Sequence, residues 1–243
     1  MRADAQRNAE KLRRAAAELF QERGLQAPLK EIARRAGVSH GTLYNLFGTR
    51  EALIDDVIAD LAGERLEEVG REALDREDAW DGFAYYIERI CELQVSDPAM
   101  RDVITGRYPD AERLMAACES ARVDSVRIIE RAQRAGSLRP DFTSGDLVFV
   151  FGTNAVIAQA AEDTAPEAWR RGIAFFLDGL RSEAAHPLPT APLTPRQLHE
   201  VMANVTGTPV RGQRVTAGAG AGDGTPESGT RRLPGVVTGL PPS

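Results

Sequence analysis

The chain has 243 residues, of which 42% are hydrophobic and 27% are charged, and its formal net charge is −6. These proportions are typical of a globular protein, and they exclude collagenous, coiled-coil and wholly disordered chains. The longest uncharged apolar stretch, residues 147–161, is too short and too polar to cross a bilayer, and residues 1–20 lack the apolar core of a signal peptide. We therefore expect a cytoplasmic protein with no membrane partner.

Three helices are predicted at the start of the chain, because apolar residues recur there at helical spacing. The first covers residues 8–23. The second covers residues 28–36 and has Pro28 at its first position, where a missing N–H costs nothing. The third covers residues 41–47 and has Ser39 as its N-cap. The third helix is therefore only about two turns long.

A longer fourth helix follows, capped by Thr49 and running to about residue 70. Pro and Gly residues then separate further helical patterns, and no strand alternation is present. The predicted segments are residues 78–94, 99–106, 111–135, 144–161 and 166–184. The sequence thus predicts an all-α fold with nine helices in its first 186 residues.

The last part of the chain, residues 187–243, holds nine Pro and nine Gly, a composition that cannot bury a core. Residues 194–206 are an exception, because a Thr cap, a Pro at the first position and apolar residues at helical spacing predict one short amphipathic helix. Residues 208–243 are expected to be disordered.

Charge is distributed unevenly along the chain. Residues 1–50 hold 10 Arg or Lys and 5 Asp or Glu, whereas residues 51–186 hold 15 and 28. A basic head on an acidic body indicates a polyanion-binding end, with nucleic acid as the leading candidate. Chance fluctuation in a charged helical protein is the alternative.

Catalytic and metal-binding motifs are absent from the sequence. Cys91 and Cys118 stand far apart with no CxxC pattern, so we expect two buried thiols rather than a disulfide or a zinc site. The sequence has no GxSxG, phosphate-binding glycine loop or HExxH, and its three histidines are isolated. We expect neither enzymatic activity nor a cofactor.

The second and third helices form a helix-turn-helix candidate. Ala33 lets the two helices approach closely, Gly37 supplies a positive φ at the turn, and Ser39 caps the helix that would enter the major groove. Val38 fills the small core between them. An ordinary helical hairpin is the alternative interpretation of these residues alone.

The 25 residues from Leu29 to Leu53, LKEIARRAGVSHGTLYNLFGTREAL, resemble the signature of the TetR family, and the resemblance extends over residues 7–57. The turn at residues 136–141 and the two apolar helices after it look like the regulatory domain of actinobacterial members. The resemblance implies an all-helical, dimeric transcriptional regulator, usually a repressor. Its C-terminal domain binds a small molecule and thereby releases a palindromic DNA operator.

The resemblance makes the third helix the recognition helix. His40 and Asn45 are the best candidates for base-edge contacts, whereas Thr42 and Tyr44 more plausibly reach phosphates. Arg50, with Arg7 and Lys30, is expected to clamp the DNA backbone without reading sequence. Solvated surface side chains are the alternative for His40 and Arg50. The full predicted DNA-binding set is Arg7, Lys30, Ser39, His40, Gly41, Thr42, Tyr44, Asn45, Thr49 and Arg50.

Two positions depart from the family pattern. Pro28 stands where a threonine is common, which removes a phosphate-binding hydroxyl and a backbone donor. Leu46 stands where a histidine or an aromatic residue is usual, so we expect it to pack on the fourth helix instead.

Two further sites are predicted in the helical body. An apolar pocket between helices is the expected effector site, although plain core packing is the alternative for its residues. The last two body helices are the family's dimer element, with intrachain packing as the alternative. The pocket candidates are Phe83, Tyr86, Ile90, Met100, Ile104, Met115, Cys118 and Phe149. The dimer candidates are Phe151, Gly152, Ala155, Gln159, Gly172, Phe175, Phe176 and Gly179.

The expected organisation is a helix-turn-helix DNA-binding domain at residues 1–48, a ligand-binding and dimerisation domain at 49–186, and the tail at 187–243. The expected partners are an operator duplex, an unknown small-molecule effector and a second copy of the chain. A small-molecule-binding helical module whose DNA binding is degenerate is the alternative function.

Overall fold

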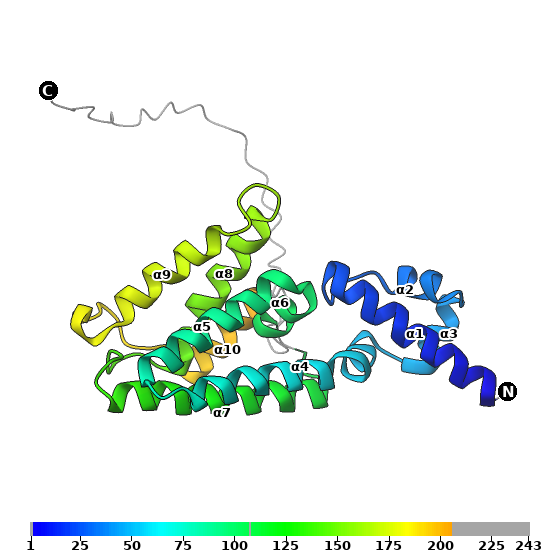
Figure 1. The fold of residues 1–243 in the computed structure, drawn as a ribbon. Coiled ribbons are helices and arrows are strands. Elements are labelled where there is room, and N and C mark those ends of the chain that lie inside the picture. Colours follow the sequence, from blue (N-terminus) through cyan, green and yellow to red (C-terminus); the bar gives the residue numbers. More distant parts are fainter. Residues whose placement is uncertain (1, 107, 206–243) are drawn as a thin grey trace, which may run out of the picture. The chain divides into compact units, whose positions relative to one another are not determined.

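The computed structural model describes residues 2–106 and 108–205, so the predicted disorder of residues 208–243 lies outside the described residues. Within the described part every regular element is helical, apart from one isolated bridge between Leu138 and Arg181 (Figure 1). The all-α prediction is therefore confirmed. The helices are α1 (Arg2–Arg23), α2 (Leu29–Ala36), α3 (His40–Phe47), α4 (Arg50–Asp75), α5 (Ala79–Ser96), α6 (Pro98–Thr105), α7 (Glu112–Arg134), α8 (Leu147–Ala161), α9 (Ala168–Leu180) and α10 (Pro195–Val205), with 3-10 turns η1 (Ser144–Asp146) and η2 (Ser182–Ala184).

The first three helices enclose a small core of their own. Phe20, Ile32 and Leu43 come from α1, α2 and α3 in turn, and all three side chains are fully buried. The turn between α2 and α3 has Gly37 at φ 67°, and because a Cβ there would meet no atom within 4 Å, backbone conformation rather than space requires the glycine. Pro28 lies one position earlier than predicted, at the N-cap of α2.

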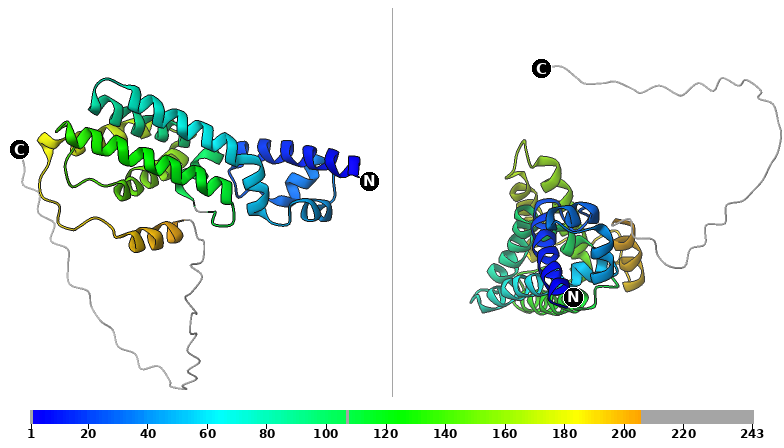
Figure 2. Two further views of the ribbon diagram at one scale, coloured as in Figure 1. Left: turned by 90° about the horizontal axis from the view of Figure 1, so that it is seen from below. Right: turned by 90° about the vertical axis from the view of Figure 1, so that its right-hand side faces the viewer.

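Helix α4 is longer than the pattern predicts, because Gly70 does not end it. A Cβ at Gly70 would lie 3.1 Å from a carboxylate oxygen of Asp124, so the glycine lets α7 pack closely against α4. The helix continues to Asp75, and Ala73 in its last turns is buried. Both ribbon views show α4 and α7 side by side along their lengths (Figure 1 and Figure 2). This pair is the largest helix–helix contact in the described residues.

Helix α5 packs on this pair, α6, α8 and α9 pack on α5, and α9 ends earlier than predicted. The Arg139 N–H donates to the Leu180 carbonyl at 3.0 Å, and the Ser182 N–H donates to the Ser137 carbonyl at 3.1 Å. These bonds pull the chain after Leu180 out of the helix and alongside residues 137–139. No helix within the described ranges combines the length and the apolarity needed to cross a membrane.

Candidate DNA-binding face and ligand cavity

Helix α3 presents the predicted base-reading side chains. The Ser39 hydroxyl accepts from the Thr42 N–H at 3.1 Å, which confirms Ser39 as the N-cap. Asn45 and Tyr44 are exposed, whereas His40 is half-buried because its ring lies edge-on to that of Tyr44, with ring centres 4.8 Å apart. Leu43 points inward and is fully buried. The helix therefore has one side in the core and one side open to a partner.

The remaining predicted contacts are distributed around this helix. Gly41 and Lys30 are exposed, and Lys30 makes no ion pair with any residue that the structure describes. Arg7 forms an ion pair with Asp4 at 2.6 Å. The Thr49 hydroxyl accepts from the Ala52 N–H at 3.0 Å, so it caps α4 as predicted.

Leu46 is partly buried and packs against the hydrophobic core. Packing of Leu46 on α4 in particular stays a prediction.

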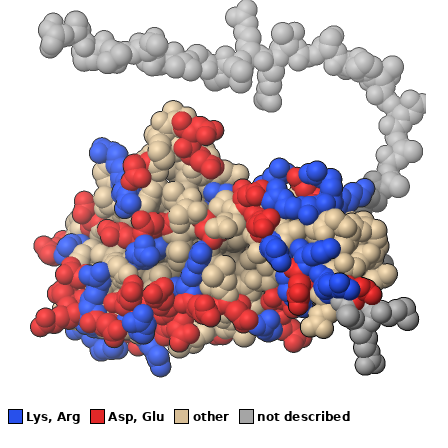
Figure 3. Space-filling view, turned by 45° about the vertical axis from the view of Figure 1, so that its right-hand side comes forward, with Lys and Arg blue, Asp and Glu red and all other residues tan. Residues whose placement is uncertain are grey.

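Basic side chains gather near the N-terminal helices. On the face drawn in Figure 3, Lys and Arg cluster over these helices, whereas Asp and Glu are spread over the helical body. Several of these cations form ion pairs within the chain. Arg13 contacts Asp56 at 2.6 Å, and Arg35 contacts Glu22 at 2.6 Å. The free cations, Lys30 among them, are the ones available to a polyanion.

Arg50 is engaged by the protein rather than free. Its guanidinium donates to the carbonyl oxygens of Leu25 and Ala27 at 2.9 and 2.7 Å. These carbonyls belong to the loop that joins α1 to α2, so Arg50 fastens this loop to the start of α4. The alternative of a solvated charge is wrong, and a phosphate contact by Arg50 stays a prediction.

Replacing Arg50 by alanine should lower the free energy of unfolding by about 1.5–3 kcal/mol, because two carbonyls lose a charged donor. Urea denaturation would measure the change, with Lys30→Ala as the control, for which little change is expected. Unchanged stability combined with weaker DNA binding would instead make Arg50 a phosphate ligand.

Helix α6 holds the same loop from the other side. A carboxylate oxygen of Asp102 accepts from the Leu25 N–H at 2.7 Å. Gly24, which has φ 78°, leaves room for this contact, since a Cβ there would lie only 2.4 Å from Asp102. The start of α6 is fixed by Asp97, which caps the helix and pairs with Arg65 of α4 at 2.6 Å. The loop after α1 is therefore bonded to both α4 and α6.

Replacing Asp102 by alanine should destabilise the protein by about 1–3 kcal/mol, because the Leu25 N–H would lose its acceptor. Asp102→Asn keeps an acceptor oxygen of the same shape and should cost much less. Urea denaturation of the two variants would separate these outcomes. Equal losses for alanine and asparagine would show that the oxygen at this position does not hold the loop.

The same carboxyl group gives stability a pH dependence. Burial raises the pKa of Asp102, although the Leu25 N–H and Arg101 act to lower it. The folded chain therefore binds this proton more readily than the unfolded chain, whose Asp pKa is about 3.9. The contribution of Asp102 to the free energy of unfolding should therefore fall as pH rises from the unfolded-state pKa through the raised pKa of the folded chain. Asp102→Asn should remove this pH dependence from a plot of unfolding free energy against pH.

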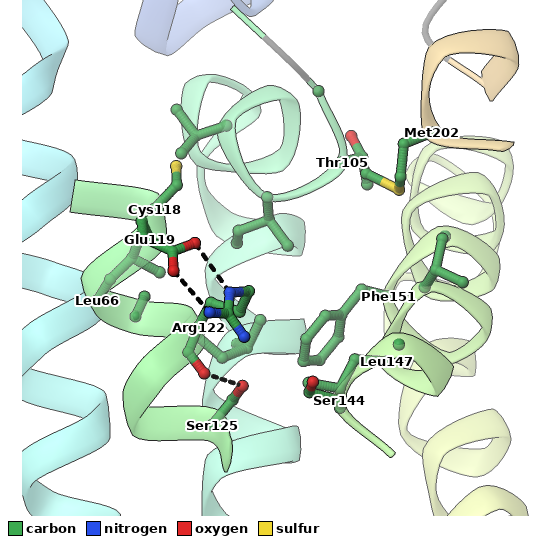
Figure 4. Close-up of a pocket in the computed structure, with 18 of the residues that line it drawn as sticks. Leu66, Thr105, Cys118, Glu119, Arg122, Ser125, Ser144, Leu147, Phe151 and Met202 are labelled. Atoms are coloured by element: carbon green, nitrogen blue, oxygen red, sulfur yellow. Dashed lines mark hydrogen bonds and ion pairs between the residues drawn. The ribbon is translucent and has the colours of Figure 1, made fainter. Parts of the chain in front are cut away.

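The helical body contains one large cavity within the described residues, with a volume of about 450 Å³. Helices α4, α5, α6, α7, α8 and α10 and the turn η1 line it, and most of its surface is apolar. Figure 4 shows Leu147 and Phe151 on one side and α7 on the other, with Met202 near the upper edge. Val103, Ile104 and Thr105 of α6 also line it, so the helix that bonds the α1–α2 loop is a wall of the cavity.

Five of the predicted pocket residues line this cavity and three do not. Phe83 and Met100 are core residues with almost no exposed surface, and Phe149 is 52% exposed on the outer side of α8. The residues that line the cavity as predicted are Tyr86, Ile90, Ile104, Met115 and Cys118. Cys118 is consequently half-buried, while Cys91 is buried as expected.

The predicted dimer residues separate into two groups. Phe151 and Ala155 are buried within the chain, and Phe151 and Gly152 line the cavity, so an interface role for Phe151 and Ala155 stays a prediction. Phe176 is half-buried against the core. Four candidates remain exposed: Gln159, Gly172, Phe175 and Gly179.

Helices α8 and α9 nevertheless expose large apolar side chains. Val156 is 65% exposed and Phe175 is 63% exposed, and Phe149 and Ile157 are exposed beside Val156 on α8. We call these four residues the α8–α9 apolar surface. Helix spacing places 149, 156 and 157 on one side of α8.

A capped two-turn helix exposed beside basic residues, joined to a cavity-bearing helical body, defines the class of helix-turn-helix regulators. Two family models match the chain: "Bacterial regulatory proteins, tetR family" over residues 12–57 and "Transcriptional regulator SbtR-like, C-terminal domain" over residues 78–182. The chain belongs to the TetR family of transcriptional regulators.

One relative is similar to the chain in sequence, and two solved structures are similar to it in fold. The chain is 31% identical over 118 residues to the HTH-type transcriptional regulator AlkX of Mycobacterium tuberculosis, a match that covers 47% of this chain and spans about half (52%) of AlkX. Its fold is similar to that of FadR from Bacillus subtilis in complex with stearoyl-CoA, at TM-score 0.53, 16% identity and 73% and 99% coverage of this chain and that chain. It is also similar to the ketosteroid regulator KstR2 of M. tuberculosis, at TM-score 0.50, 22% identity and 71% and 94% coverage.

Proposed function

We propose that the chain is a ligand-responsive repressor that binds a palindromic operator as a homodimer. In this proposal residues 1–48 bind DNA, residues 49–186 bind the effector and the partner copy, and the protein acts in the cytoplasm, where the operator lies. The proposal assigns it no catalytic activity.

One observation carries the ligand response. Helix α6 lines the cavity through Val103 and Ile104, and through Asp102 it bonds the loop between α1 and α2. A ligand that shifts α6 must therefore strain or break a bond to the DNA-binding helices. Ligand binding and DNA binding are then linked, because each favours a different position of α6.

The dimer follows from the length of the recognition helix and from the α8–α9 apolar surface. A helix of two turns reads few base pairs, so two copies on two half-sites supply the affinity and the length of sequence that one copy lacks. The α8–α9 apolar surface, which includes Phe175 of α9, is the face we assign to the partner copy.

Selection from a random-sequence duplex library tests the proposal. We expect an inverted repeat whose half-sites lie about 34–36 Å apart or a multiple of this distance, and binding that weakens steeply with salt. Retained duplexes without a shared sequence would contradict a specific regulator. If the chain shows no salt-dependent binding to any duplex, the result would favour the other candidate, a small-molecule-binding module with degenerate DNA binding.

A further inference from the structure

The charged groups of the cavity are already paired with each other. Glu119 and Arg122 are the only charged side chains among the described residues that line it. The Arg122 guanidinium donates to both carboxylate oxygens of Glu119, at 2.8 and 2.6 Å, and Figure 4 shows this pair drawn with both bonds. The two side chains are 55% and 60% exposed, so this pair lies at the open edge of the cavity, and the interior of the cavity holds no charged side chain among the described residues.

Hydroxyl groups supply the polar chemistry of the cavity, and that of Thr105 donates to the Arg101 carbonyl at 2.7 Å. Ser125 is buried and donates to the Arg122 carbonyl at 2.7 Å, and the buried Tyr86 phenol lies against it. The Ser144 hydroxyl makes no hydrogen bond with any described residue. These groups can exchange hydrogen bonds with an uncharged oxygen or nitrogen atom, but they cannot neutralise a charge.

Helix α10 closes part of the cavity. Leu198 and Met202 lie one turn apart on this helix, and both side chains line the cavity. A methyl group of Leu198 reaches within 3.7 Å of the position that a Cβ on Gly145 would occupy. The helix is capped by Thr194, whose hydroxyl accepts from the Gln197 N–H at 3.3 Å. The short helix predicted from the tail is therefore a wall of the ligand site.

We propose that the cavity binds an uncharged, largely apolar molecule carrying a hydroxyl or carbonyl group, and that α10 forms the wall that shields it from water. This inference rests on the proposed function, because it names the chemical class of the effector. A charge brought into an apolar cavity without a partner is strongly disfavoured. Apolar surface buried against Phe151, Leu198 and Met202 supplies the affinity.

A matched pair of fluorescent dyes tests the charge requirement. N-phenyl-1-naphthylamine is uncharged, and 8-anilinonaphthalene-1-sulfonate has the same ring system with an added sulfonate. The full chain should bind the uncharged dye at least about tenfold more tightly, since the apolar interior of the cavity holds no described cation to pair with a sulfonate. Equal or tighter binding of the sulfonate would overturn the proposal.

Arg122→Gln tests whether Arg122 determines the relative affinities of the two dyes. The variant removes the cation and leaves the apolar walls intact, so the affinity for the uncharged dye should change less than about twofold. If the sulfonate binds the wild-type chain and Arg122→Gln abolishes that binding, Arg122 is an anion site and the ligand class is wrong.

Two substitutions on adjacent residues of α10 test the wall. Leu198→Glu places a carboxylate on the cavity side, whereas His199→Glu places the same group on the exposed side of the helix. Leu198→Glu should weaken binding of the uncharged dye at least about tenfold, and His199→Glu should leave it unchanged. Equal affinities of the two variants would show that the dye binds elsewhere and that α10 is no wall.

Salt-dependent duplex binding, measured without dye, separates this inference from the proposed function. Failure of the dye predictions in a chain that still selects an operator overturns the ligand class alone. If the dye predictions hold in a chain that binds no duplex, the proposed ligand class is supported and the proposed function as a DNA-binding regulator is contradicted.

Discussion

Replacing Phe175 by glutamate should convert the protein to a monomer and lower its affinity for a palindromic duplex by about a hundredfold or more, because a second linked contact multiplies affinity by about 10² to 10⁴. Phe175 is 63% exposed and forms part of the α8–α9 apolar surface. Although the Arg171 guanidinium lies over the Phe175 ring, a carboxylate on each copy of this surface would have to lose its water in the interface, which is costly. Size-exclusion chromatography and duplex titration would measure the two effects.

Val123→Glu is the matched control, since Val123 is an exposed apolar residue on α7 and lies outside the α8–α9 apolar surface. It should leave both the dimer and the duplex affinity unchanged. A dimer that survives Phe175→Glu would contradict the assignment of this face to the partner copy.

Replacing Asn45 or His40 by alanine should cost about 1–3 kcal/mol in operator binding while leaving nonspecific binding nearly intact, because base-edge contacts alone carry sequence information. Both residues belong to α3, and Asn45 is exposed for such a contact. Fluorescence anisotropy on operator and scrambled duplexes, at several salt concentrations, would give the two affinities.

Lys30→Ala is the comparison for this pair, since an unpaired exposed cation acts on phosphates and should weaken all duplexes alike. Its loss should also reduce the salt dependence by about one unit of slope. If Asn45→Ala and His40→Ala weaken both duplexes equally, α3 does not read bases through these side chains.

The N-terminal helices could be predicted closely because local rules determine them. Ser39 and Thr49 cap helices through their own hydroxyl groups, and Gly37 takes the positive φ that its turn requires. Each of these features depends on residues within one turn of helix, which is the range that sequence patterns describe. The fold class followed from the same local patterns.

The faces of α8 could not be predicted, because this helix is apolar nearly all the way round. Periodicity assigns an inner face only when polar residues mark the outer one. The sequence predicts Phe149 in the pocket and Phe151 in the dimer surface, whereas in the structure Phe149 is exposed and Phe151 lines the cavity. Neighbouring helices, not the sequence of α8, determine which phenylalanine faces the cavity.

The contacts of Arg50 and Asp102 were hidden for a different reason. Both side chains bond the loop at residues 24–28 from positions far along the chain, and Asp102 lies 77 residues from Leu25. No spacing rule relates such positions, so the sequence predicts Arg50 only as a DNA contact and predicts no role for Asp102. The length of α4 was missed similarly, because Gly70 serves a contact with α7 that only the fold reveals.

Sedimentation of the chain with a duplex selected from the random library tests the central claim most directly. The account predicts a dimer when the chain is free at micromolar concentration and two copies bound to each inverted-repeat duplex. One copy per duplex, or a free chain that remains monomeric, would contradict a repressor that reads two half-sites through paired recognition helices.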